Sequence, residues 1–282
     1  MKNKEATTIS ILGCGWYGLP AGHLLSSLGY RVNGSTRSIH KMERLSGQGI
    51  HPYLAEVSQH EINAQDDFFE CEVLLVSFPP GVKGGDASEY VQKIRNLIKR
   101  ILKSPVKEVL FISSISIYGD QNAEVDEDTT PLPETSSGKA LLEAENLLKK
   151  ESDFHTTILR FAGLVGPGRH PGRFLSGKKQ VPDGDAPVNL VHLNDCLGIT
   201  KEIITNKLFG HTFNVCAPDH PSRKDFYTLA AQTGGFTIPE FSGTAGGWKI
   251  VKSRKIPSLL QWRYSTGDWL HYLTENSDSF IG

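Results

Sequence analysis

The stretch Ile9-Ser-Ile-Leu-Gly-Cys-Gly-Trp-Tyr-Gly18 decides the fold of this chain. A short apolar, β-prone run leads into Gly13-x-Gly15-x-x-Gly18, and apolar residues at helical spacing follow: Leu19, Leu24, Leu25 and Leu28. This order predicts a strand, a tight turn, and a helix whose N-terminus faces a pyrophosphate. Gly13 makes the turn, Gly15 lets backbone amides approach the anion, and Gly18 lets the helix pack on the sheet. The amides and the helix dipole then hold the phosphates without a basic side chain.

Length and composition narrow the classes of protein that fit. A chain of 282 residues can bury one large core or a domain with a smaller lobe. Its net charge of −1 gives no electrostatic case for nucleic acid or an acidic membrane surface. No apolar run is long enough to span a bilayer, and the polar N-terminus lacks a signal-peptide core. The four cysteines are scattered along the chain and indicate neither a disulfide framework nor a metal site. We expect a cytoplasmic protein that binds no metal, although Cys14 lies where a redox-sensitive thiol could sit.

Strand-like and helical patterns alternate through the first 160 residues, which predicts a doubly wound parallel α/β sheet covered by helices. The expected strands are Ile9–Leu12, Arg31–Gly34, Tyr53–Val57, Glu72–Ser77, Glu108–Ser113 and Thr157–Phe161. Apolar residues at helical spacing fill Tyr90–Leu102 and Lys139–Lys150. The acidic, proline-containing segment Asp120–Pro133 reads as an exposed loop at the carboxyl edge of the sheet, where such sheets bind ligands.

After Phe161 the pattern becomes irregular. Val188–Val191 and His211–Val215 read as strands, and Asn194-Asp195 can cap a helix that begins at Cys196. Further helices are expected at Arg223–Thr233 and near Trp262–Tyr272. We therefore expect a Rossmann domain formed by residues 1–165 and 188–217, and a small substrate-binding lobe formed by residues 166–187 and 218–282.

With these landmarks the chain resembles the extended branch of the short-chain dehydrogenase/reductases, the group that contains nucleotide-sugar epimerases and dehydratases. The resemblance covers nearly the whole length. Besides the glycine turn it rests on Val76-Ser-Phe-Pro-Pro80, Phe111-Ile-Ser-Ser-Ile-Ser-Ile-Tyr-Gly119, Val125-Asp-Glu-Asp128, Leu159-Arg-Phe-Ala-Gly-Leu-Val-Gly-Pro-Gly168, Val188-Asn-Leu-Val-His-Leu-Asn-Asp195 and Phe213-Asn-Val215. Each fragment is weak alone, and their order is specific.

The end of the second strand predicts the cofactor. NAD-preferring Rossmann sites place a carboxylate there for the ribose 2′-hydroxyl, whereas this chain has Asn33-Gly-Ser-Thr-Arg37 and no acid before Glu43. Ser35, Thr36 and Arg37 can donate to a 2′-phosphate, so we expect NADP(H), with NAD as the second possibility. The alternative is that Arg37 is solvated and Ser35 or Ser38 caps a helix. By resemblance, the remaining cofactor contacts are Trp16, Tyr17, Phe78, Pro79, Lys139 and Phe161.

The catalytic pattern of the family is incomplete. It consists of a Ser or Thr, a Tyr, and a Lys four residues after the Tyr, and the tyrosine exchanges a proton with the substrate oxygen. Ser114 and Lys139 stand at the serine and lysine positions, but Thr135 replaces the tyrosine. A threonine hydroxyl is a far weaker acid than a phenol. Tyr118 follows the same strand as Ser114 and is one possible substitute.

The substrate side is less specific. Arg173 lies in the glycine-rich excursion that the resemblance places over the substrate, and it can contact a phosphate or carboxylate or remain solvated. His155 and His192 read as structural, and the tryptophans Trp248, Trp262 and Trp269 read as lobe core.

Two functions fit. The first is an NAD(P)-dependent epimerase/dehydratase or reductase that acts on a sugar nucleotide or a related carbonyl compound. The second is a non-catalytic NADP(H)-binding sensor or regulator. By resemblance, the helices Tyr90–Leu102 and Lys139–Lys150 are those that relatives pair in a homodimer. The first is apolar over a broad face, which fits either a dimer or packing on the sheet.

Overall fold

The computed structural model describes residues 7–81, 87–244, 246–276 and 280. The chain divides into two compact units. The first comprises residues 1–117, 133–160 and 200–212, and the second comprises residues 118–132, 161–199 and 213–282. This division assigns more of the chain to the second unit than the predicted lobe contains, because residues 118–132 and 188–199 pack with the C-terminal part.

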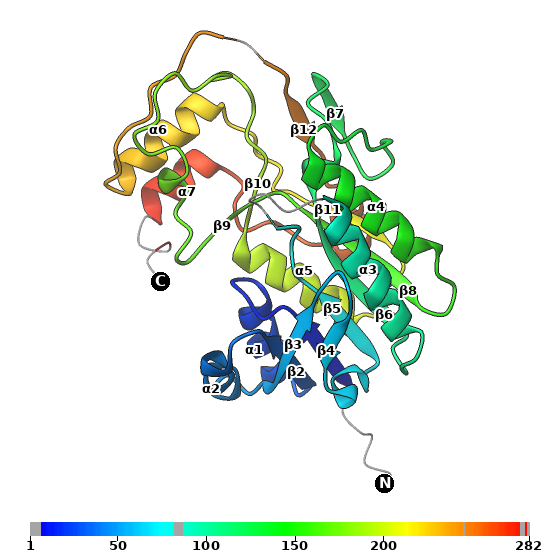
Figure 1. Cartoon of the computed structure of the whole chain (residues 1–282). Coiled ribbons are helices and arrows are strands. Elements are labelled where there is room, and N and C mark those ends of the chain that lie inside the picture. The colour runs from blue at the N-terminus through cyan, green and yellow to red at the C-terminus, as the bar shows by residue number, and fades with distance from the viewer. Residues whose placement is uncertain (1–6, 82–86, 245, 277–279, 281–282) are drawn as a thin grey trace. The chain divides into compact units, whose positions relative to one another are not determined.

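A mostly parallel sheet confirms the predicted fold class. In the described part of the chain its strand order is β11-β8-β6-β5-β1-β2-β3-β4 (Figure 1). The strands are β1 (Thr8–Leu12), β2 (Arg31–Thr36), β3 (His51–Val57), β4 (Ile62–Ala64), β5 (Val73–Val76), β6 (Glu108–Ser114), β8 (His155–Phe161) and β11 (Thr212–Val215). The pairs β1–β2, β1–β5, β2–β3 and β5–β6 are parallel. Strand β4, which the sequence pattern did not predict, is short and pairs antiparallel with β3.

Helices cover this sheet. They are α1 (Gly18–Ser27), α2 (Met42–Ser46), α3 (Ala87–Ile101) and α4 (Ser136–Lys150), with the short 3-10 turns Ile39–Lys41, Asp66–Phe69 and Ile115–Ile117 between elements. Helices α3 and α4 lie side by side (Figure 1). The apolar face of α3 is buried within this chain, since Ile94 and Leu97 are both 0 % exposed. That face therefore serves intramolecular packing, and a homodimer stays a prediction.

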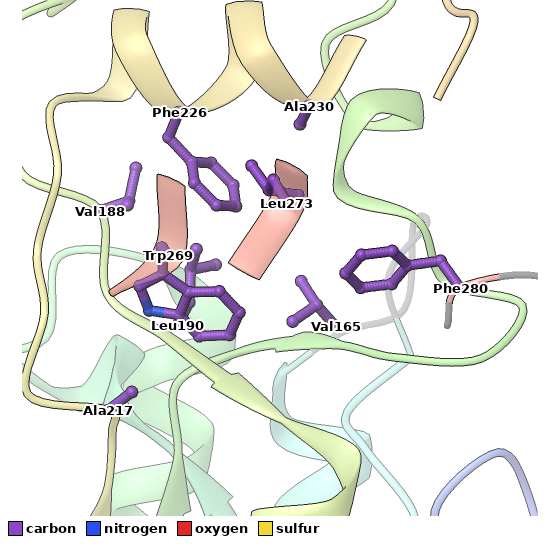
Figure 2. Close-up of a cluster of buried hydrophobic side chains, with 9 residues drawn as sticks. All are labelled: Val165, Val188, Leu190, Ala217, Phe226, Ala230, Trp269, Leu273 and Phe280. Atoms are coloured by element: carbon purple, nitrogen blue, oxygen red, sulfur yellow. The ribbon is translucent and has the colours of Figure 1, made fainter. Parts of the chain in front are cut away.

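The described residues of the second unit form short strands and further helices. The strands pair as β9 (Gly163–Val165) with β10 (Leu190–His192), and as β7 (Ala123–Val125) with β12 (Lys249–Val251). The helices are α5 (Leu193–Thr205), whose last turns belong to the first unit, α6 (Arg223–Thr233) and α7 (Trp269–Glu275); a 3-10 turn covers Pro171–Arg173. Figure 2 shows the core of this unit, in which Trp269 and Phe226 meet edge to face between α6 and α7. Trp269 is fully buried, as predicted, whereas Trp248 and Trp262, for which the same was predicted, are half-buried.

Two predictions for this unit are wrong. The expected loop Asp120–Pro133 contains β7, which pairs with a strand that follows it by more than 120 residues. The expected helix Trp262–Tyr272 begins only at Trp269, and the preceding Ile256–Leu260 is a π-helical turn. The late start of α7 is explained by Asp195, which lies within the first turn of α5 rather than before the helix, so its predicted role as a cap is wrong as well. Its carboxylate accepts hydrogen bonds from Trp262 Nε1 (3.2 Å), Ser265 N (2.9 Å) and Ser265 Oγ (2.8 Å), and these contacts hold residues 262–265 in a non-helical conformation.

Candidate functional site

The glycine turn between β1 and α1 is braced from both sides. Gly13 has φ +110°, a backbone conformation that favours glycine. Its N–H donates to Ser35 Oγ (2.8 Å), and its carbonyl accepts from Ser77 Oγ (2.6 Å). The ends of β2 and β5 therefore hold the turn in one conformation.

The N-terminus of α1 is prepared for an anion. No side chain caps it, and its first turn contains no acidic residue. A Cβ on Gly15 would meet no atom within 4 Å, so open space lies beside this backbone, whereas a Cβ on Gly18 would overlap the carbonyl oxygen of Gly13. The first N–H groups of a helix lack intrahelical partners and carry a partial positive charge. The residues present therefore fit the diphosphate of a dinucleotide, and a contact between Gly15 and that anion stays a prediction.

The residues at the end of β2 differ in what they offer a ligand. Strand β2 extends to Thr36, so Ser35 lies inside the strand, 3 % exposed, with its hydroxyl bonded to Gly13. Thr36 Oγ1 accepts from Ser38 N (3.1 Å). Arg37 is exposed, and it makes no hydrogen bond or ion pair with any residue that the structure describes. Of the three predicted 2′-phosphate contacts, Arg37 is therefore the one whose donors remain available.

The other predicted cofactor residues lie in varied surroundings. Tyr17 is buried, and its hydroxyl shares a hydrogen bond with Thr200 Oγ1 (2.6 Å), which fixes the start of α1 against α5. Trp16 is half-buried and Pro79 is exposed. The ring of Phe78 packs edge to face on Tyr90, whose hydroxyl donates to the Phe78 carbonyl (3.2 Å). Phe161, at the end of β8, is buried and belongs to the second unit.

Ser114 and the start of α4 come together in the first unit. Ser114 ends β6, is half-buried, and accepts from Ser116 N (3.1 Å) through its Oγ, which leaves its hydroxyl proton for another acceptor. A Cβ on Gly138 would overlap the carbonyl oxygen of Ser116, so only glycine lets α4 approach this segment so closely. Lys139 follows Gly138 directly and is exposed, and its ammonium has no partner among the described residues. The serine and lysine predicted from the sequence thus lie on neighbouring segments.

Thr135 and Tyr118 both have hydroxyls with structural partners. Thr135 is the N-cap of α4, and its Oγ1 accepts from Gly138 N (3.0 Å). This role explains a threonine here without any chemistry. Tyr118 belongs to the second unit and is 2 % exposed, with its hydroxyl near the Asp126 carbonyl (2.7 Å) and Asn214 Oδ1 (3.0 Å). To act as a proton donor it would have to leave these acceptors.

A buried ion pair behind Ser114 was not predicted. Glu145 on α4 and Arg160 on β8 are 1 % and 4 % exposed, and Arg160 Nη2 donates to Glu145 Oε2 over 2.7 Å. Ser113 Oγ completes the network by donating to Glu145 Oε1 (2.6 Å). The network ties β6, α4 and β8 together next to Ser114. The amphipathic pattern of α4 gave no sign that Glu145 faces inward.

The candidate substrate residue Arg173 lies on the surface of the second unit. It is exposed, with its guanidinium 5.9 Å from the centre of the Phe236 ring. It lines neither of two cavities in that unit. The smaller, 570 Å³, is bordered by Asp183, Lys224, Phe241, Trp248 and Ile250 among others. The larger, 760 Å³, is bordered by residues of segments 216–220 and 251–264.

His192, His155 and Cys14, which the sequence singled out, lie in structural surroundings. His192 Nδ1 accepts from Asn194 N (3.2 Å), and burial, opposed by the charge of Asp195, lowers its pKa, which fits the structural role expected. His155 Nδ1 contacts Glu108 (3.2 Å) at the surface. Burial raises the pKa of the Cys14 thiol to about 12, although a backbone hydrogen bond at Ser35 acts in the opposite direction, so this thiol is protonated and unreactive at neutral pH.

Within the residues that the structure describes, no group of His, Cys, Asp or Glu side chains could hold a metal ion. No helix in the same residues is long and apolar enough to cross a membrane.

The fold and the turn define a class: an α/β protein of the Rossmann type, with a mostly parallel sheet and a glycine turn between β1 and α1. The comparisons with known proteins specify the family. Residues 85–216 match the model of the "NAD dependent epimerase/dehydratase family". Protein YeeZ of Escherichia coli K12 is 36 % identical over 265 residues, which cover 92 % of this chain and 96 % of YeeZ. The chain belongs to the NAD-dependent epimerase/dehydratase family.

Solved structures share the fold at lower identity. A conserved protein of unknown function from Silicibacter pomeroyi has a TM-score of 0.78 at 22 % identity, with 97 % of this chain and 100 % of that chain covered. UDP-glucuronic acid 4-epimerase from Bacillus cereus, solved in complex with NAD, has a TM-score of 0.77 at 17 % identity, with 94 % of both chains covered. At these identities the likeness concerns the fold.

Proposed function

We propose that this protein is an NAD(P)-dependent epimerase/dehydratase- or reductase-like enzyme whose substrate is a nucleotide sugar or a related carbonyl or hydroxyl compound. The observation that carries the proposal is the turn at Gly13–Gly18, with its open face at Gly15 and its uncapped helix N-terminus. A turn that is braced by the buried Ser35 and the half-buried Ser77, and left open on one face, suits the binding of a diphosphate. Membership of the family favours this function over that of a non-catalytic sensor.

The substrate class is supported by the relatives. The Bacillus cereus structure is that of a UDP-sugar epimerase in complex with NAD. When bound, a nicotinamide dinucleotide supplies reversible hydride transfer at a carbon that bears oxygen. Around such a carbon the chain must supply hydrogen bonds to the oxygen and a positive charge beside the cofactor ribose. Ser114, with a free hydroxyl proton, and Lys139, with an unpaired ammonium, fit these two roles.

The missing tyrosine limits what the site can do for the proton. General acid–base catalysis contributes about 10²- to 10⁴-fold to rate. Thr135 cannot supply it, because its hydroxyl caps α4 and is a weak acid. We therefore propose Ser114 as the hydrogen-bond donor to the reacting oxygen and Lys139 as the charge that favours the dinucleotide. Tyr118 stays a candidate proton donor that requires its two acceptors to be released.

For the cofactor we propose a preference for NADP(H), because the unpaired guanidinium of Arg37 follows β2 and no carboxylate stands there. The test is a fluorescence titration of the full chain with NADPH and NADH side by side. Tighter binding of NADPH, lost in Arg37→Ala and kept in the matched exposed control Arg44→Ala, is expected. Equal binding of the two nucleotides by the unaltered chain, or an unchanged preference in Arg37→Ala, would contradict the proposal for Arg37. A lack of binding of either nucleotide by the unaltered chain would refute the proposed function.

Turnover is tested separately. The protein, loaded with the preferred nucleotide, is incubated with UDP-glucose and UDP-glucuronic acid, and products are followed by NMR. We expect product formation that falls at least tenfold in Ser114→Ala and in Lys139→Met, while the surface variant Arg44→Ala keeps its rate. Unchanged rates in both site variants would remove Ser114 and Lys139 from the mechanism.

A cytoplasmic location and a homodimer complete the proposal. All four cysteines are free thiols, which suits a reducing compartment. Sedimentation of the purified chain tests the dimer.

A further inference from the structure

A second cavity of the second unit has no role in the proposed function. It measures 760 Å³, a size typical of small-molecule sites. Three cationic side chains, Lys252, Arg254 and Arg263, line it together with the rings of Trp262 and Tyr264. It shares no lining residue with the 570 Å³ cavity, because strand β12 separates the two: Ile250 borders the smaller and Val251 the larger.

The aromatic wall of this cavity is held rigidly. The indole N–H of Trp262 donates to the fully buried Asp195 (3.2 Å), and its ring packs directly on the backbone of Gly198, where any Cβ would overlap it. The hydroxyl of Tyr264 shares a hydrogen bond with Ser253 Oγ (2.8 Å). Flat rings fixed by hydrogen bonds at their polar ends offer an apolar surface without further loss of side-chain freedom.

The charges of the cavity are unbalanced. Lys252 pairs with Glu124 (3.3 Å) and Arg254 with Asp126 (2.9 Å), but in both pairs one partner is at least 60 % exposed. Ion pairs exposed in this way are weak and give way to a competing anion. Arg263 is exposed and makes no hydrogen bond or ion pair with any described residue. Its five donors are therefore available for a phosphate or carboxylate.

Unusual backbone leads into this wall. The π-helical turn Ile256–Leu260 ends at Gln261, which has φ +52° in the left-handed region. Such turns, and non-glycine residues in this region, occur often at functional sites, where they direct particular side chains. Here they immediately precede Trp262 and Arg263. The cavity, the fixed rings, the unpaired guanidinium and the irregular backbone are four separate observations on one segment.

We propose that this cavity binds a small organic phosphate that carries a planar ring, with Arg263 as the main phosphate contact, Lys252 as the second, and Trp262 as the surface for the ring. The site is independent of the dinucleotide turn, since every lining residue belongs to the second unit. The proposal therefore stands or falls separately from the proposed function.

The test uses phenyl phosphate, which combines the two recognised groups, in a calorimetric titration of the full chain. We expect saturable binding of one equivalent. Arg263→Ala should weaken it roughly tenfold or more, and Arg263→Lys should weaken it less, because the charge remains but the bidentate geometry is lost. The control Arg44→Ala, an exposed arginine of the first unit, should bind as the unaltered chain does.

Two further probes separate the contributions. Inorganic phosphate should bind more weakly than phenyl phosphate, and phenol should not bind measurably, if the ring and the anion act together. Quenching of tryptophan fluorescence by phenyl phosphate should diminish in Trp262→Phe.

Two outcomes overturn the proposal: an equal affinity of Arg263→Ala and the unaltered chain for phenyl phosphate, or a lack of saturable binding to the unaltered chain. Since Arg263 is exposed, its variants should fold, and circular dichroism checks this. The conservative Arg263→Lys keeps the test decisive should Arg263→Ala be impaired.

Discussion

The glycine turn of the first unit and segment 248–265 of the second unit reach a defined backbone by opposite routes. The turn is held by Ser35, near the end of β2, and by Ser77, which follows β5. Its shape follows from three glycines within six residues. Segment 248–265 has little regular structure, and partners far away in sequence hold it. Glu127 accepts from Arg254 N (3.1 Å) and Lys255 N (3.2 Å), more than 120 residues away.

The difference concerns how much information a short window of sequence carries. In the turn, the residue types themselves require the conformation, because only glycine allows the positive φ at Gly13 and the close contact at Gly18. In segment 248–265, acids of residues 120–128 meet bases of residues 249–255: Lys249 pairs with Asp120, Lys252 with Glu124, Arg254 with Asp126 and Lys255 with Asp128. No local rule predicts such a pairing, although the parallel register of β7 and β12 brings it about.

The largest effect should come from the carboxylate that fixes the C-terminal segment. Asp195→Ala leaves Trp262 Nε1, Ser265 N and Ser265 Oγ without their acceptor. Trp262 is half-buried and Ser265 is exposed, so water can replace part of these contacts. A hydrogen bond to a charged group contributes about 1.5–3 kcal/mol, so over the three bonds we expect a loss of roughly 3 kcal/mol in the free energy of unfolding. Urea denaturation followed by tryptophan fluorescence measures it. Asp153→Ala, at an exposed position, is the control, and a loss below about 1 kcal/mol in Asp195→Ala would show that the segment holds its shape without this anchor.

The second prediction sets two glycines of the turn against each other. Gly18→Ala forces a Cβ against the Gly13 carbonyl oxygen, and overpacking of this kind costs about 1–3 kcal/mol of stability. Gly15→Ala adds a methyl group where no atom lies within 4 Å, so its stability should stay within about 0.5 kcal/mol of the unaltered chain. Denaturation and NADPH titration of both variants make the comparison. We expect Gly15→Ala to fold normally and bind NADPH poorly; normal binding would mean that the dinucleotide does not lie against Gly15.

The third prediction, of a smaller effect, distinguishes a purely structural role of Thr135 as the N-cap of α4 from a role in the reaction. Thr135→Ala removes the acceptor of Gly138 N and should destabilise the protein by about 1 kcal/mol, whereas Thr135→Ser should keep most of that stability. Thermal unfolding measures both variants. Because the cap is local to α4, turnover by folded Thr135→Ser should match that of the unaltered chain. A loss of turnover in Thr135→Ser without loss of stability would instead assign chemistry to this residue.

The sequence correctly predicted those features of the fold that depend on residues close together in the chain. The doubly wound parallel sheet, the turn, the helix with Lys139 and the buried Trp269 all followed from periodicity, glycine spacing or resemblance, whereas the order of the strands was not predicted. The structural role of Thr135 was not predicted, because a cap and a replaced catalytic residue look alike in sequence. Asp195 was taken for a helix cap because an Asp before an apolar helix is a typical cap, and only the tertiary structure shows that Trp262 and Ser265 are its partners. The cavity beside Arg263 was missed for the same reason, since its walls come from segments more than 30 residues apart.

The smallest expected effect on stability comes from the ion pairs between residues 120–128 and residues 249–255, and it can be detected through its dependence on pH. Burial alone would raise the pKa of Asp126, but the Thr129 hydroxyl, the Asp128 N–H, the Arg254 guanidinium and the Thr129 N–H together lower it below its ordinary value of 3.8. A carboxyl whose pKa is lowered by folding contributes stability at pH values above its unfolded pKa and loses that contribution as pH falls through the folded pKa. Asp126→Asn should therefore be less stable than the unaltered chain at pH 7, by less than about 1 kcal/mol because Arg254 is largely exposed. We would repeat the urea titrations from pH 7 downward. The difference in the free energy of unfolding between Asp126→Asn and the unaltered chain should narrow below about pH 4, because the carboxyl of Asp126 then becomes protonated and loses its charge. A gap that stays constant across this range would show that Asp126 supports the segment through the shape of its loop alone. The ion pair between Asp126 and Arg254 would then be a consequence of the fold and would not stabilise it.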